Sequence, residues 1–210
     1  MTPQQPGSPL PGSYRWALVA AVVVGFQVAL SAAFDVQAAL NHDDPPAMTG
    51  SEAALPGLGL SPLAQRQVML AAVSGYQSAL AGMLPWRTGS SLLLALAAGL
   101  VFFMGMRLRV SPEDRPRAAQ LLGKAALAAA ALRTIDGAEN LVLVRTTFDE
   151  MGKAFVREGL ADAEAMTSVL TFAGSLASGA WTLVMVGLFV TLGNYFRSDV
   201  LRAALGRAGP

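Results

Sequence analysis

Near the middle of the 210-residue chain, an otherwise apolar stretch is interrupted by four polar residues: Arg133, Asp136, Glu139 and Asn140. Two carboxylates beside a guanidinium can bind and release protons or pair with ions. A charged side chain at the centre of a membrane helix costs about 2.5–3.5 kcal/mol on insertion scales, so it usually has a partner or a function. These residues are therefore the first candidates for chemistry in the chain.

The spacing of the four residues places them on one face of a helix. At about 100° per residue they fall within an arc of roughly 120°. Arg133 and Asp136 are three residues apart and Asp136 and Asn140 are four apart, and both spacings let side chains meet on a helix. We expect this polar face to point into a helix bundle or a wet cavity.

Three interpretations of these residues remain open at the level of sequence. The first is a proton- or ion-handling site, with Asp136 and Glu139 as titrating groups and Arg133 as their counter-charge. The second is structural: the polar side chains satisfy one another, or join the helix to its neighbours or to a partner subunit. In the third, residues 133–140 lie at or beyond the membrane interface and are solvated.

Composition restricts the class of protein. Hydrophobic residues make up 53% of the chain and charged residues 14%, whereas ordinary soluble domains have about 45–50% apolar and about 25% charged residues. A net charge of +1 offers no basic field for nucleic acid. The absence of cysteine excludes disulfides and thiolate ligands, and a single histidine, His42, excludes a histidine-rich metal site within one chain.

Four apolar stretches are predicted to span the membrane, at about residues 16–34, 88–106, 120–144 and 167–195. A spanning helix needs about 20 residues. The first stretch could instead be a cleaved signal peptide. However, its apolar run exceeds the usual length of about 7–15 residues and a single charge, Arg15, precedes it, which favours a retained anchor.

Arginine distribution supports a span over 120–144, the least apolar of the four stretches. Basic residues favour the cytoplasmic side. If 120–144 spans, the basic loop 107–119 and the basic tail 197–210 both lie inside, and the acidic loop 145–166 lies outside. The sequence therefore predicts cytoplasmic N- and C-termini.

The remaining segments are predicted as loops and tails around one transmembrane domain, residues 14–196. Residues 1–13, rich in Pro, Gly, Ser and Gln, are expected to be a disordered cytoplasmic tail. The outer loops 35–87 and 145–166 are each predicted to contain a short amphipathic helix. Ser61 and Pro62 would begin the first helix and Pro85 would end it, whereas a capping box of Thr147 and Glu150 would begin the second.

Other motifs are weaker. Small residues in the last span form two overlapping pairs that allow close helix packing, within the chain more readily than between copies: Gly174 with Ser178, and Ser175 with Gly179. The loop residues 42–44, His-Asp-Asp, are expected to be solvated rather than to bind a divalent ion. Phosphate-binding glycine loops and the HExxH and G-x-S-x-G motifs are absent.

The sequence thus predicts an all-α, polytopic integral membrane helical bundle with four transmembrane helices and two short extracytoplasmic amphipathic helices. Abundant alanine, and arginine in excess of lysine, indicate a GC-rich bacterial genome and hence a bacterial inner membrane. The expected function is that of a non-enzymatic structural or accessory subunit, packing against itself or a membrane partner. The alternative is a small transporter or channel component. No catalytic residue, cofactor, metal or nucleic-acid partner is predicted.

Overall fold

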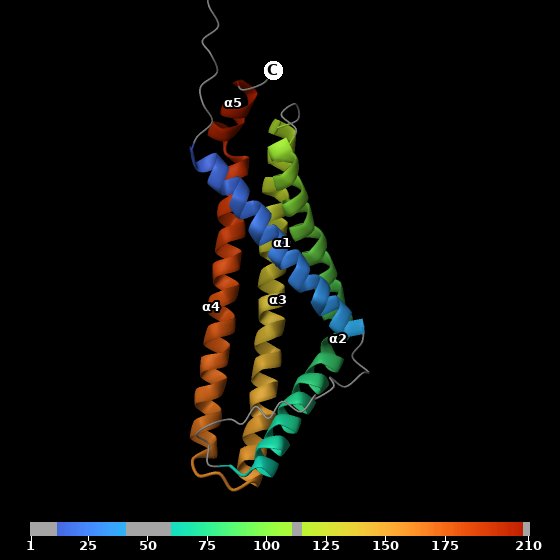
Figure 1. Cartoon of the computed structure of the whole chain (residues 1–210), viewed down its shortest axis with the longest axis vertical. Helices are drawn as coiled ribbons and strands as arrows, with labels where there is room; N and C mark the ends of the chain where they lie inside the picture. Colours follow the sequence, from blue (N-terminus) through green and yellow to red (C-terminus); the bar gives the residue numbers. More distant parts are fainter. Residues whose placement is uncertain (1–11, 41–59, 111–114, 208–210) are drawn as a thin grey trace, which may run out of the picture. The chain divides into compact units, whose positions relative to one another are not determined.

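A computed structural model of the chain describes residues 12–40, 60–110 and 115–207 (Figure 1). All regular secondary structure in these ranges is α-helical, which confirms the all-α prediction. The helices are α1 (Gly12–Leu40), α2 (Pro62–Val110), α3 (Arg115–Arg157), α4 (Ala163–Arg197) and α5 (Asp199–Arg207).

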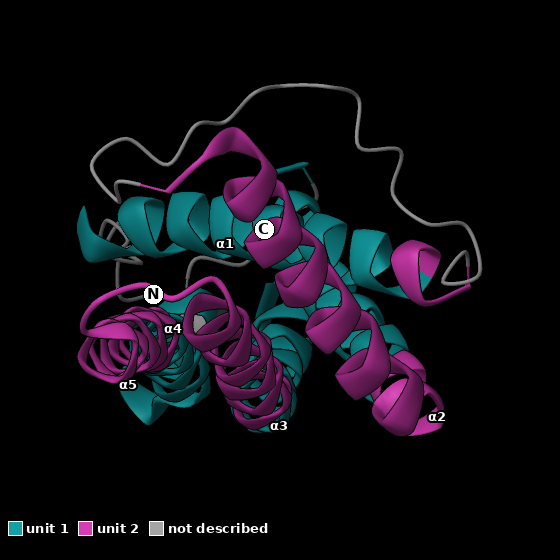
Figure 2. Ribbon diagram, turned by 90° about the horizontal axis from the view of Figure 1, so that it is seen from below, with its two compact units in different colours: residues 1–36, 89–135, 182–210 teal, residues 37–88, 136–181 magenta. Residues whose placement is uncertain are grey.

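The chain divides into two compact units, which Figure 2 shows in different colours. Unit 1 comprises Met1–Val36, Gly89–Ile135 and Thr182–Pro210, and unit 2 comprises Gln37–Thr88 and Asp136–Trp181. Helices α1, α2, α3 and α4 each contribute residues to both units. The polar residues 136–140 therefore belong to unit 2, and Arg133 to unit 1.

The core of unit 1 combines small and large apolar side chains, with Phe189 and Phe196 of α4 among the large ones. Helix α3 contributes a run of buried alanines that ends at Ala129 and Ala130, while α1 and α2 contribute residues such as Ala21 and Ala98. Helix α5 adds Leu201 and Leu205, which lie four residues apart and so share one buried face. Small residues at helix contacts let the backbones approach closely, which is how helices pack where lipid removes the hydrophobic driving force.

Two pairs of helices in unit 1 approach so closely that glycine is required. A Cβ atom at Gly25 of α1 would lie 2.8 Å from the backbone nitrogen of Phe102 and 3.0 Å from the carbonyl oxygen of Ala98, both in α2. Gly123 of α3 and Gly193 of α4 face each other in the same way, because a Cβ on either would lie within 3.2 Å of the other's carbonyl oxygen. At Gly25 the contacts are with backbone atoms, so a side-chain rotation cannot relieve an added methyl group, whereas at Gly123 and Gly193 side-chain atoms of Arg197 and Leu127 lie closer than the backbone.

Unit 2 has a smaller core at the turn between α3 and α4. Val68 and Phe155 are fully buried there. The turn is a Schellman motif: the N–H of Gly159 bonds to the carbonyl of Val156 at 3.1 Å, and the N–H of Leu160 bonds to that of Phe155 at 3.1 Å. Gly159 has φ +68°, the left-handed conformation that the motif needs, and Leu160 packs on the small core as the motif's apolar contact.

Three helices among the described residues are long and apolar enough to cross a membrane: α1, α2 and α4. The predicted number of such helices was four, but α3 is not in this set. Its 43 residues include charges from Arg115 to Arg157, and its apolar run is mostly alanine, a weakly hydrophobic residue.

Several predicted helix boundaries were wrong. Pro85 does not end a helix, because it lies inside α2, which is 49 residues long. Proline removes one backbone hydrogen bond, but apolar helices tolerate this loss when nearby groups compensate. The predicted capping box at Thr147 lies in the interior of α3, where the Thr147 hydroxyl donates to the carbonyl of Leu143 at 2.8 Å. The two expected outer helices are therefore parts of α2 and α3.

Other boundaries differ less. Ser61 caps α2 as predicted, since its hydroxyl oxygen accepts the N–H of Ala64 at 3.2 Å. Helix α1 continues through Asp35, where a loop was expected, to Leu40. The segment predicted as a plain tail from residue 197 contains α5, capped by Ser198, whose Oγ accepts the N–H of Leu201 at 3.3 Å. Residues 1–11 and 42–44 lie outside the described ranges.

The α1–α2 contact leads to a first prediction. Gly25→Ala should lower the free energy of unfolding by about 1–3 kcal/mol, because the added methyl group overpacks a backbone contact. Thermal unfolding in mild detergent measures the change. Gly99→Ala is the matched control, since its Cβ meets no described atom within 4 Å. Alanine favours a helix by about 1 kcal/mol over glycine, so the control should be as stable as wild type or slightly more stable. Equal stability of the two variants would show that Gly25 is not packed against the backbone of α2.

Candidate functional site

A buried arginine of α2, Arg87, meets the polar face of α3 inside unit 2. Arg87 is only 4% exposed. Its Nη2 donates a hydrogen bond to Oδ1 of Asn140 at 3.0 Å, and its Nη1 lies 4.0 Å from Oε2 of Glu139. A cation from a second helix is thus in contact with the candidate residues that the sequence identified on α3.

Asn140 connects this arginine to a buried carboxylate. Its Nδ2 donates to Oδ2 of Asp136 at 3.4 Å, one helical turn earlier. Asp136 is fully buried. An amide side chain suits the bridging position because it accepts through its oxygen and donates through its nitrogen. We call Arg87, Asp136, Glu139 and Asn140 the α2–α3 polar cluster.

The structure places the four residues predicted from the sequence in two units. Asp136, Glu139 and Asn140 come together in the polar cluster, whereas Arg133 lies one turn earlier on α3 and belongs to unit 1. Arg133 was expected to supply the counter-charge, and that role stays a prediction. Within unit 2, Arg87 is a counter-charge in contact with Glu139.

The energetics of the cluster follow from its burial. The side chains of Arg87 and Glu139 are 5% and 13% exposed, so both charges have lost most of their hydration. Buried ions are tolerated when they are paired and hydrogen-bonded, and removing one partner leaves an uncompensated charge. The arrangement can therefore fasten α2 to α3, and its two carboxylates are also groups that could carry a proton.

Sequence reasoning missed Arg87 because it assigned that residue to the predicted outer loop 35–87. A signal was nevertheless present in the sequence. Arg87 directly precedes the predicted span 88–106, at the end that was predicted to face outward. Arginine at the outer end of a span opposes the positive-inside bias, which indicates a specific partner.

The small residues of α4 that were predicted to allow close helix packing lie in unit 2, and we call them the small-residue seam: Gly174, Ser175, Ser178 and Gly179. Their environments differ. A Cβ at Gly174 would lie 2.5 Å from Cε2 of Phe148 and 3.2 Å from Cγ1 of Val144, so this glycine packs tightly against α3. Gly179 faces open space, with no described atom within 4 Å of a Cβ there. Ser178 is half-buried. The close helix approach therefore centres on Gly174, and self-association through the seam stays a prediction.

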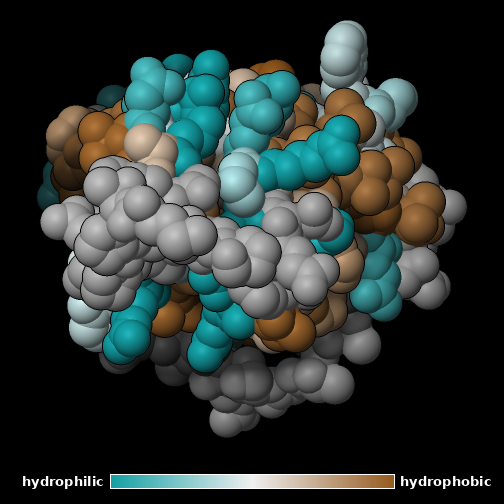
Figure 3. All heavy atoms as spheres, turned by 90° about the horizontal axis from the view of Figure 1, so that it is seen from above, coloured by the Kyte–Doolittle hydropathy of each residue, from teal (hydrophilic) through white to brown (hydrophobic). Residues whose placement is uncertain are grey.

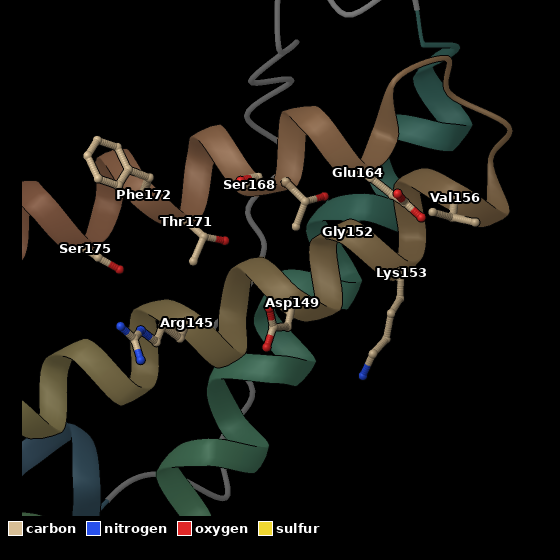
Figure 4. A pocket seen from close by; sticks show the side chains of 11 residues that line it. Arg145, Asp149, Gly152, Lys153, Val156, Glu164, Ser168, Thr171, Phe172 and Ser175 are labelled. Carbon is tan, nitrogen blue, oxygen red and sulfur yellow. The ribbon is translucent and has the colours of Figure 1, made fainter.

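The fourth seam residue, Ser175, lines an open groove of about 740 Å³ between α3 and α4 in unit 2 (Figure 4). Thr171 and Ser175 lie on the α4 side, and Arg145 and Asp149 on the α3 side. The hydroxyl oxygens of Thr171 and Ser175 are buried, and no described residue accepts or donates a hydrogen bond to them. Charges of both signs line the groove, so it does not select a ligand by net charge.

Metal binding finds no support in the described part of the chain. No group of three or more His, Asp or Glu side chains comes close enough there to hold a metal ion. Residues 42–44, the His-Asp-Asp triplet considered from the sequence, are outside the described ranges.

Comparisons of the chain with models of protein families, with curated proteins and with solved structures found no match.

The polar cluster leads to a second prediction. Arg87→Leu should lower the free energy of unfolding by about 3–5 kcal/mol, because it leaves the buried carboxylates without their cation from α2. Denaturation in mild detergent measures the loss. Arg66→Leu removes an exposed arginine from the same helix and unit, and it should change stability by no more than about 0.5 kcal/mol.

A double-mutant cycle isolates the ion pair in this prediction. Glu139→Gln removes the charge that lies 4.0 Å from Arg87, so Arg87→Leu should cost less in that background than in wild type. Strictly additive losses, or an Arg87→Leu variant as stable as Arg66→Leu, would show that the two side chains do not stabilise each other.

Proposed function

We propose that the chain is a non-enzymatic, multi-pass membrane protein that acts as a structural or accessory subunit. Its three long apolar helices support the membrane location. The observation that carries the structural role is the hydrogen bond from Arg87 to Asn140, with Glu139 alongside. Because the cation comes from the facing helix, the polar side chains are used to hold α2 against α3.

We further propose that α3 crosses the membrane as a fourth span, at about residues 120–144. Its alanine run is buried in the core of unit 1, and Ala126 and Ala129 are fully inaccessible. A helix enclosed by other helices needs less hydrophobicity than one that faces lipid, because its contacts depend on close packing. With this span, the arginines at the end of α2 and in α5 lie on one side, which the positive-inside bias makes the cytoplasm of a bacterial cell.

The exposed apolar face of α1 supports an association role. Trp16, Val23, Phe26, Leu30 and Phe34 are all exposed and recur at helical spacing along one side of the helix. Such a face can contact lipid tails, and it equally suits a helix of a membrane partner or of a second copy of the chain.

A second candidate function is proton or ion handling through the polar cluster. The observation in its favour is the complete burial of Asp136, since buried carboxylates in apolar helices are frequent parts of proton pathways. In this alternative Asp136 and Glu139 exchange the proton, and Arg87 replaces Arg133 as the nearby cation.

Asp136→Asn separates the two functions. The substitution keeps the size of the side chain and removes its charge. For a structural subunit we expect the variant to have a free energy of unfolding in detergent about 1–3 kcal/mol lower than that of wild type. Proton flux into proteoliposomes should then equal that into empty liposomes, for wild type and variant alike. Asp149→Asn, at an exposed position of α3, is the control. Flux through the wild type that Asp136→Asn abolishes, with stability unchanged, would establish the transport function instead.

The four-span topology has its own test. Reporter fusions at residue 112 and residue 155 should report opposite sides of the membrane, because residues 120–144 lie between them. Since the chain contains no cysteine, single cysteines at Arg109 and Lys153 allow the same measurement by impermeant labelling of the intact chain. Signals from the same side would mean that α3 does not span.

A further inference from the structure

Several helix termini lie together at one end of unit 1, and arginines lie near each of them. The start of α1, the end of α2, the start of α3 and α5 lie together there (Figure 1). Viewed onto this end, Figure 3 shows hydrophilic side chains beside apolar ones. The described acid of this end, Asp199, pairs with Arg202 at 3.3 Å. The other arginines near these termini include Arg15, Arg107, Arg109, Arg115, Arg117 and Arg197.

A buried hydroxyl group lies within this end of unit 1. Tyr14 of α1 is 5% exposed, and its ring packs edge-on against Phe196, with the ring centroids 6.4 Å apart. No described residue supplies a hydrogen-bond partner for its Oη. Buried tyrosine hydroxyls usually have a partner, because an unsatisfied polar group loses its hydration without compensation. The site therefore suits a group from outside the described chain.

Arg115 is the first residue of α3. It is close enough to Tyr14 to interact electrostatically with it, and its Nε is likewise buried without a partner among the described residues. A guanidinium N–H is a donor only, and a phenol O–H can donate. An oxygen-rich anion satisfies both groups, and phosphate is the anion that arginine binds best.

The start of α1 adds to the positive potential. A helix N-terminus presents unpaired N–H groups and the positive end of the helix dipole, which favours an anion and disfavours a cation. The first turn of α1 nevertheless contains Arg15 and no acidic residue, and residues 1–11 contain no Asp or Glu. Ser13 adds a hydroxyl group, which lies 3.1 Å from the hydroxyl of Tyr195.

We propose that this end of unit 1 binds the phosphate of an anionic phospholipid, with Tyr14 Oη and Arg115 Nε donating to phosphate oxygens. A lipid fits better than free phosphate because α1 also presents exposed apolar side chains at this end of unit 1. Trp16 is 77% exposed two residues after Tyr14, and Val19 follows one turn later. Tryptophan is the residue that membrane proteins place at the level of the headgroups. The arginines around the site favour a lipid of net negative charge.

Lipid titration of the purified full chain in mild detergent tests the proposal. Bound lipid is measured by native mass spectrometry, with phosphatidylglycerol and phosphatidylcholine compared. Wild type should bind phosphatidylglycerol at least about tenfold more tightly, and Tyr14→Phe and Arg115→Gln should each weaken that binding by about tenfold, the effect of losing one charge-assisted hydrogen bond. Tyr76→Phe and Arg109→Gln are the controls, since both residues are exposed, and they should change affinity by less than about twofold.

Four outcomes would overturn the proposal. Equal binding of phosphatidylcholine would mean that charge is not recognised, and an equal loss in Arg109→Gln would mean diffuse attraction without a site. Displacement of phosphatidylglycerol by millimolar inorganic phosphate would indicate a free anion as the ligand.

The fourth outcome concerns the chain's own acids, because Glu113 and Asp114 directly precede α3 in the sequence. If one of them supplies the anion, Tyr14→Phe will reduce stability in lipid-free detergent and leave lipid affinity unchanged.

Discussion

Arg87 has lost nearly all its hydration on α2 and is in contact with Asn140 and Glu139 of α3, beside the fully buried Asp136. Desolvating these charges is costly, and the cost is recovered only while the partner groups remain within hydrogen-bonding or ion-pairing distance. In unit 2, α2 must therefore stay aligned with α3, because only this alignment keeps the buried polar groups paired. Asn140 is central, because its amide group links the guanidinium to the carboxylate of Asp136.

The close packing of the helices answers a different constraint. In lipid, apolar side chains gain little by leaving the solvent, so helix contacts depend on van der Waals packing at short range. Gly25 lies against the backbone of α2, and Gly123 and Gly193 lie against each other between α3 and α4. Unit 1 uses these contacts together with buried alanines. The same core contains large side chains, Phe189 and Phe196 among them, while other large apolar residues of α1 face outward.

Much of the local structure follows from short-range patterns in the sequence. The all-helical class, the apolar stretches of α1, α2 and α4, and the N-cap at Ser61 were all predictable, because each depends on residues within a turn or two of one another. The shared face of Asp136 and Asn140 was predictable for the same reason, since their spacing of four residues brings them together on any α-helix. Hydropathy and arginine distribution predicted α3 as a span, but its composition does not place it with the other three helices.

Other features depend on residues that are far apart in the sequence. Pro85 and Thr147 carry local signals for helix boundaries, yet α2 and α3 continue through both. The contact between Arg87 and Asn140 could not be predicted from the sequence, because the two residues are 53 positions apart and lie on different helices. The sequence by itself determined which residues are helical and which share a helix face, because those properties are local. Tertiary structure decided which cation meets which carboxylate and which glycine meets a backbone, because these contacts arise only when helices distant in sequence pack together.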